Sequence, residues 1–151
     1  MIQVSEEHAQ RWSEIMPVIL RKLNARAGEA ASRLELSMTQ AEVISYLNEN
    51  GPTTMGELSD HIVVSLSAMT NVVDRLFQKE FVTRDRDQTD RRVVKVTLTD
   101  AGKKLANDVA EVKRAHAIAV LGALDEADRE QVLAIMAKLA ENLSPKRTSN
   151  A

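Results

Sequence analysis

The stretch from Thr54 to Thr99 places two short helical patterns ahead of two β-rich runs. Thr54 and Glu57 have capping-box spacing, in which each side chain bonds the other residue's backbone N–H at a helix start. Val63-Val64 follows as a turn, and Ser65 is a favourable N-cap for the next helix. This order predicts a supporting helix, a second helix joined to it by a tight turn, and a hairpin beside both.

The two β-rich runs, residues 81–84 and 93–98, indicate a pair of strands. The second run alternates apolar and polar residues, as a strand with one buried face does. The loop between them, from Asp85 to Arg92, contains no glycine, which disfavours a two-residue turn and favours a longer, projecting wing. Two helices with such a hairpin predict a winged helix-turn-helix within a mainly α (α+β) fold.

Further helical patterns flank this unit. From Ser5 apolar residues recur at three- and four-residue steps, with Pro17 inside the pattern, where a bend or a restart of the helix is expected. Ser37 with Gln40 forms a second capping box, and two more helices are predicted to begin at Thr99 and Asp125. The apolar residues expected to face inward are Leu66, Met69, Val72, Val73, Leu76 and Phe77 after Ser65, and Val132, Leu133, Met136, Leu139 and Leu143 in the last helix.

The composition fits one globular domain and excludes several functions. A chain of 151 residues with 44% hydrophobic and 28% charged residues can bury a real core. The absence of cysteine excludes disulfides, thiolate zinc sites and thiol-based redox sensing. The N-terminus lacks the apolar run of a signal peptide, and no segment has the roughly 18 apolar residues of a membrane span. A cytoplasmic protein is therefore expected.

Nothing in the sequence indicates an enzyme. It contains no glycine-rich phosphate loop, no G-x-S-x-G motif and no cysteine nucleophile. His8, His61 and His116 lack the spacing of a metal site, so neither a metal nor another cofactor is expected.

The net charge of −2 is unevenly distributed. From Arg75 to Lys104 there are nine basic and five acidic residues, a surplus of four positive charges, which leaves −6 on the remainder. A slightly acidic chain is not the usual signature of a nucleic-acid binder, but steering of a charged partner depends on the local field. The hairpin region is where a polyanion would be attracted.

The segment from Asp90 to Gly102, DRRVVKVTLTDAG, resembles the wing signature of the MarR family of bacterial transcriptional regulators. That signature is D-R-R, a short strand and L-T-x-x-G. The run from Thr70 to Leu76 resembles the family's recognition helix, and the likeness covers about residues 5–143. Three residues depart from the pattern: Phe81 stands where a glycine is common, Asn71 stands where an arginine is common, and Pro17 is unusual within the first helix.

The resemblance implies a sequence-specific transcriptional regulator, usually a repressor, that binds double-stranded DNA as a homodimer on a pseudo-palindromic operator. It implies a helical dimerisation region at residues 1–36 and 100–145, and a winged helix-turn-helix DNA-binding lobe at 37–99. Residues 146–151 are expected to form a disordered tail. It also implies a small aromatic or phenolic effector held between the two regions.

The candidate DNA-binding residues lie on the second helix of the motif and on the wing. Asn71 can bond an adenine edge, and Arg75 a guanine or a phosphate. A wing arginine is expected in the minor groove, while Asp74 is expected to pair with Arg75, Arg92 or a cytosine amine. The full set is Ser65, Ser67, Ala68, Thr70, Asn71, Arg75, Arg84, Arg86, Arg91 and Arg92, with Asp90 in a wing salt bridge.

Four residues are candidates for contact with an effector: Trp12, Met16, Tyr46 and His116. The alternative for the first three is core packing, and for His116 a place in the core or at a dimer interface. Two other functions compete with DNA binding. One is a winged-helix module that binds protein, which would need an exposed apolar patch, and the other is an unrecognised small-molecule-binding protein or enzyme.

Overall fold

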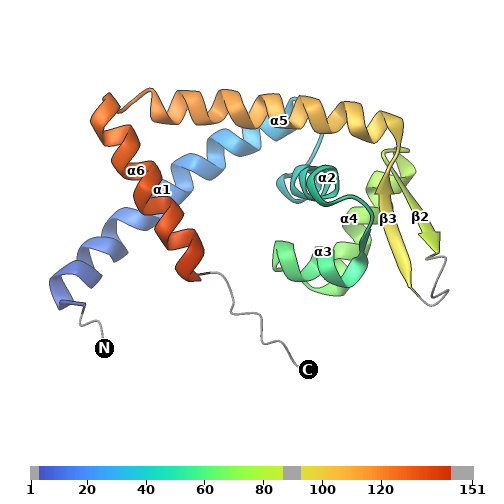
Figure 1. The fold of residues 1–151 in the computed structure, drawn as a ribbon, viewed down its shortest axis with the longest axis horizontal. Helices are drawn as coiled ribbons and strands as arrows, with labels where there is room; N and C mark the ends of the chain where they lie inside the picture. Colours follow the sequence, from blue (N-terminus) through green and yellow to red (C-terminus); the bar gives the residue numbers. More distant parts are fainter. Residues whose placement is uncertain (1–3, 87–92, 144–151) are drawn as a thin grey trace. The chain divides into compact units, whose positions relative to one another are not determined.

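The computed structural model describes residues 4–86 and 93–143, which form a mainly helical fold with one small antiparallel sheet (Figure 1). This confirms the predicted fold class. None of the helices in these ranges combines the length and apolar character of a membrane span. The elements are α1 (Glu6–Ser32), α2 (Met38–Asn50), β1 (Thr53–Thr54), α3 (Met55–Ile62), α4 (Leu66–Gln78), β2 (Val82–Arg86), β3 (Val94–Leu98), α5 (Asp100–Leu121) and α6 (Glu126–Leu143).

The chain divides into two compact units, Met1–His116 and Ala117–Ala151. The first unit contains the whole winged motif, in which α2, α3 and α4 gather beside the β2–β3 hairpin (Figure 1). The second contains the end of α5 and all of α6.

The helix starts predicted from capping residues are confirmed. Ser37 N–H donates to Gln40 Oε1 at 2.8 Å, and Gln40 N–H donates to Ser37 Oγ at 3.2 Å. At Thr54 the reciprocal bonds with Glu57 measure 2.8 and 3.2 Å. The turn after α3 places Val63 in the left-handed region at φ 57°, a costly conformation for a β-branched residue. The capping bonds fix where α2 and α3 begin, and the turn at Val63 ends α3 before α4 starts.

The sheet has the strand order β1-β3-β2, with both pairs antiparallel. Val82 of β2 lies opposite Leu98 of β3, so the predicted strand pair is confirmed, with bounds shifted by one or two residues. β1 pairs Thr53 with Val96 and was not predicted, because a two-residue strand has no periodicity to detect. It ties the start of α3 to the base of the wing.

The core lies among α2, α3, α4, the sheet and the first half of α5. It is aliphatic, as the aromatic content of 3% requires. Full burial of one such side chain contributes roughly 1.5–3 kcal/mol to folding. The largest fully buried side chains are Val43, Ile44, Leu58, Met69, Val73, Leu76, Val82, Val96 and Val109.

The structure corrects part of the expected α4 core. Leu66 is 56% exposed and Phe77 is 50% exposed. Met69, Val73 and Leu76 occupy the middle of the apolar stripe, and at 100° per residue Leu66 and Phe77 fall together on one flank of it. The apolar stripe was therefore predicted too wide on that side.

The terminal helices also differ from expectation. No residue of α6 is buried, and Leu133, Met136 and Leu143 are 49%, 48% and 76% exposed. Their regular spacing forms an apolar stripe, but within the described residues it is left in contact with solvent. α1 runs without a restart from Glu6 to Ser32, with Pro17 inside it. Its side chains up to Leu20 are exposed apart from the half-buried Met16.

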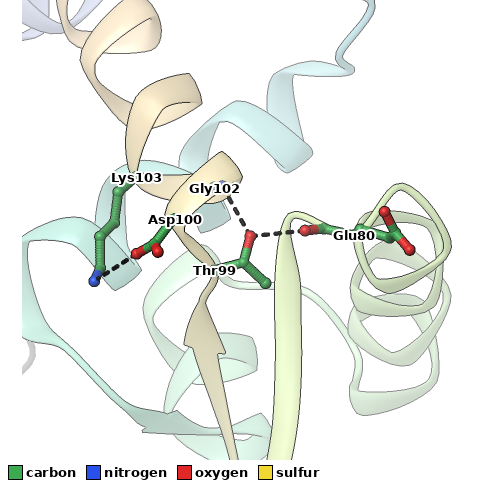
Figure 2. Close-up of polar contacts among 5 residues, drawn as sticks. All are labelled: Glu80, Thr99, Asp100, Gly102 and Lys103. Atoms are coloured by element: carbon green, nitrogen blue, oxygen red, sulfur yellow. Dashed lines mark hydrogen bonds and ion pairs between the residues drawn. The ribbon is translucent and has the colours of Figure 1, made fainter.

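Thr99 and Gly102 hold the first turn of α5 against the turn that follows α4 (Figure 2). Thr99 Oγ1 donates to the Glu80 carbonyl oxygen at 2.7 Å and accepts from Gly102 N–H at 3.0 Å, which confirms Thr99 as the cap. Thr99 N–H donates to the Phe81 carbonyl oxygen at 3.1 Å. A Cβ on Gly102 would overlap that same oxygen, so the close approach requires glycine. The T-x-x-G part of the wing signature therefore fixes α5 to the end of α4.

Candidate nucleic-acid interface

The face of α4 opposite its buried stripe is polar and open to solvent. Ser65 caps the helix, accepting a hydrogen bond from Ala68 N–H at 3.2 Å. Thr70 Oγ1 donates to the Leu66 carbonyl oxygen at 2.9 Å, and its side chain stays exposed. Because α4 is anchored by fully buried residues, this face is presented rigidly. The predicted residues that it brings together are Ser65, Ser67, Thr70, Asn71 and Arg75, which are exposed, and Ala68, which is half-buried.

An ion pair fastens the described part of the wing to α4. The Arg84 guanidinium on β2 pairs with the Asp74 carboxylate on α4, and the same guanidinium lies 5.8 Å from the centre of the Phe77 ring. Arg84 was not among the partners predicted for Asp74, because residues on separate elements cannot be matched by spacing; of the predicted partners, Arg92 lies outside the described residues. Here half-exposed Phe77 has a role, since it supports Arg84 through a cation–π contact.

The remaining wing residues are only partly described. Arg86 is the last residue of β2 and is exposed, with no ion-pair partner within the described ranges. Arg91, Arg92 and the predicted salt-bridge residue Asp90 lie outside the described residues.

A hollow of about 220 Å³, here called the α2–α4 hollow, opens between the start of α2 and one stripe of α4. Two of its residues, Asn71 and Arg75, were predicted as DNA-binding. Ser37 and Gln40 were recognised from the sequence only as a helix cap. Their spacing predicts a helix start, but it does not predict that they line a hollow. The hollow is lined by Ser37, Gln40, Ala68, Asn71, Val72 and Arg75.

A second, smaller cavity of about 60 Å³ lies among the last turns of α1, the start of α2 and α5. Its wall is mostly apolar, and His116 contributes a buried Nε2 atom with no hydrogen-bond partner in the described chain. Lys113 Nζ and Glu42 Oε2 form an ion pair of 3.1 Å at its border. The lining residues are Ala27, Ala31, Leu34, Met38, Ala41, Glu42, Val109, Val112, Lys113 and His116.

The four effector candidates do not form one cluster. His116 lines the small cavity, whereas Trp12, Met16 and Tyr46 do not. Trp12 is 54% exposed on α1, and the Tyr46 ring lies against the His61 ring with 4.2 Å between centroids. Among the described residues no group of three or more histidine, aspartate or glutamate side chains could hold a metal ion.

An exposed polar helix beside a hairpin, joined to it by a turn and an ion pair, defines a winged helix-turn-helix protein. The profile of the MarR family matches residues 36–94. The chain is 31% identical over 127 residues to the uncharacterized HTH-type transcriptional regulator YcgE of Bacillus subtilis, with 82% of each chain covered. It is 29% identical over 126 residues to the HTH-type transcriptional repressor MdtR of the same organism, covering 83% of this chain and 81% of MdtR.

The fold agrees with these relationships. The solved structure of a MarR family protein from Bacillus stearothermophilus gives a TM-score of 0.83 at 23% identity, covering 95% of this chain and all of that one. The chain belongs to the MarR family of transcriptional regulators, which are DNA-binding proteins and not enzymes. The resemblance inferred from the wing signature is thereby confirmed.

Proposed function

We propose that this protein is a homodimeric regulator that represses transcription by binding a pseudo-palindromic operator in double-stranded DNA. The observation that carries the proposal is the exposed polar face of α4, held beside a wing that Arg84 fastens to it. In this proposal each α4 enters a major groove, where Asn71 bonds an adenine edge. Arg86, Arg91 or Arg92 enters the adjacent minor groove, whose negative potential attracts guanidinium.

Uncovered apolar residues at both ends of the chain support the homodimer. Large exposed apolar patches on a folded chain mark interaction surfaces. Residues 1–36 and 100–145 would form the dimerisation region, and residues 37–99 the DNA-binding lobe. The exposed apolar residues that support this division are Trp12, Ile15, Val18, Ile19 and Leu20 on α1, Ile118 on α5, and Leu133, Ile135, Met136 and Leu143 on α6.

Repression is supported by the likeness to MdtR, a transcriptional repressor. A repressor acts by occupying DNA, so the proposed location is the cytoplasm, where an operator is accessible. The rival function, a winged-helix module that binds protein, is less well supported because the exposed face of α4 is polar, apart from its flank at Leu66 and Phe77.

The small cavity at His116 is the proposed place for an aromatic or phenolic effector. Its unpaired Nε2 can bond a hydroxyl or carboxyl group, and its other walls are mostly apolar. The cavity of about 60 Å³ is well below the roughly 150 Å³ that accommodates benzene. An aromatic ring would therefore have to separate α1, α2 and α5 on entry. In this proposal the effector changes the spacing of the two DNA-binding lobes, a shift between conformations, and does not block the face of α4 that contacts DNA.

The test is binding to fragments of the protein's own upstream promoter, measured by fluorescence anisotropy during a salt titration. A specific site whose affinity falls steeply with salt supports the proposal. Asn71→Ala and Arg91→Ala should each weaken that binding at least tenfold, about 1.4 kcal/mol, whereas the matched control Asn107→Ala on α5 should not. Absence of promoter binding at low salt would contradict the proposal.

A further inference from the structure

The residues that line the α2–α4 hollow indicate the kind of ligand that it binds. We propose that it binds a backbone phosphate of DNA, and that Gln40 and Arg75 are the side chains that hold it. The proposal deepens the DNA-binding function proposed above and rests on it.

The hollow is built around one stripe of α4. Asn71 and Arg75, four residues apart, both line it and are both exposed. Arg75 supplies a guanidinium, which bonds phosphate oxygens well, while the Asn71 amide keeps the adenine edge proposed for it above. None of the six lining residues carries a carboxylate, so nothing in the wall would repel an anion.

Gln40 is the lining residue that calls for a ligand. It is only 7% exposed, and its Oε1 accepts a hydrogen bond from Ser37 N–H. Its Nε2 donates no hydrogen bond to the described residues and is not among their buried unpaired atoms, so it remains available to a ligand. Ser37 Oγ accepts from Gln40 N–H, which leaves its hydroxyl hydrogen free to donate. A phosphate group, with several acceptor oxygens, would satisfy both donors.

The electrostatics at this place favour an anion. The start of α2, a 13-residue helix, carries the partial positive charge of a helix N-terminus. Among the described helices, α2 and α4 lack an acidic residue in the first turn, whereas α1, α3, α5 and α6 have at least one. Asp74, next to Arg75 in sequence, is neutralised by its ion pair with Arg84.

A phosphate in this hollow would set the register of α4 on the duplex. Phosphate contacts position a protein, while contacts to base edges specify the sequence. A guanidinium can bond either guanine or phosphate, and the place of Arg75 in the hollow favours phosphate. Ser67 and Thr70, which do not line the hollow, remain free to approach the bases.

The test combines substitutions in the protein with neutralisation of single phosphates in the DNA. Gln40→Glu keeps an oxygen that accepts from Ser37 N–H, so the capping box and the fold persist while the donor becomes a negative charge. Gln131→Glu on α6 is the matched control, because it makes the same chemical change at an exposed position. Each protein is titrated against the bound promoter site, against a random duplex, and against copies of the site carrying one neutral methylphosphonate at a time.

We expect Gln40→Glu to lose roughly tenfold or more in affinity on both duplexes, because phosphate contacts carry no sequence information. One methylphosphonate in each half-site should abolish that loss, and the same position should abolish the loss caused by Arg75→Gln. Equal behaviour of Gln40→Glu and Gln131→Glu would overturn the site alone, as would losses that no methylphosphonate removes. Absence of wild-type binding to every duplex would overturn the DNA-binding function and this site with it.

Discussion

Ile44 in α2 and Leu133 in α6 are both large apolar residues at regular helical spacing, yet Ile44 is fully buried and Leu133 is 49% exposed. The difference holds for whole regions. The winged lobe covers its own apolar face with α2, α3, α4, the sheet and part of α5, whereas the first half of α1 and all of α6 leave theirs uncovered. Apolar periodicity therefore specifies a face, but it does not say which molecule covers that face.

The largest expected effect is in the lobe. Ile44→Ala should lower the free energy of unfolding by about 2–5 kcal/mol, because it removes buried methylene groups and leaves a cavity. Urea denaturation at several protein concentrations measures this, and the loss should be the same at each. A loss below about 1 kcal/mol would show that the lobe core is not closed as described.

A charge on the uncovered face of α6 should act on association instead. Leu133→Glu places an unpaired carboxylate in the proposed interface of both subunits, and should raise the dimer dissociation constant by more than about 100-fold, or 2.7 kcal/mol. Gln131→Glu, two residues away and so on the opposite side of the helix, is the control and should dimerise normally. Analytical ultracentrifugation measures both, and equal behaviour of the two variants would remove α6 from the interface.

The attachment of α5 to the turn after α4, within the lobe, should also be sensitive. Gly102→Ala places a Cβ against the Phe81 carbonyl oxygen and should lower the free energy of unfolding by about 1–3 kcal/mol. Gly28→Ala meets nothing within 4 Å inside α1 and should be neutral or stabilise by up to about 1 kcal/mol. Thermal and urea unfolding measure the free energy of unfolding of both variants. A Gly102→Ala protein as stable as Gly28→Ala would contradict the described packing.

The smallest expected effect concerns the ion pair that fastens the wing. Asp74→Asn should cost at most about 1 kcal/mol in unfolding free energy, because both side chains remain partly exposed, at 31% for Arg84 and 43% for Asp74. It should nevertheless accelerate amide hydrogen exchange in β2, since the strand loses its ion pair with α4. Glu111→Gln, which removes a more exposed pair within α5, should leave β2 exchange unchanged. Unchanged β2 exchange in Asp74→Asn would rule out the fastening role.

The local features of the fold could be predicted from sequence because their signals lie within a few residues. The capping pairs at Ser37 and Thr54, the caps at Thr99 and Asp125 and the two wing strands are such cases. The wing signature also identified the family. The structure explains its glycine, because a Cβ at Gly102 would overlap the Phe81 carbonyl oxygen.

The contacts between elements could not be predicted in the same way. Arg84 meets Asp74 only after β2 folds against α4, and no spacing rule in the sequence matches residues on two such elements. Gln40 carries the signal of a cap, whereas its place in the α2–α4 hollow depends on how α2 packs against α4. The candidate effector residues were chosen by type, and the structure brings only His116 to the small cavity.

The central claim is that two copies of this chain read one operator together. Footprinting of the bound promoter, combined with the mass of the protein–DNA complex, tests it most directly. We expect two chains per site and two protected segments whose centres are one helical turn apart, about 34 Å, or a multiple of it. A single protected segment bound by one chain, or no protected segment at all, would contradict it.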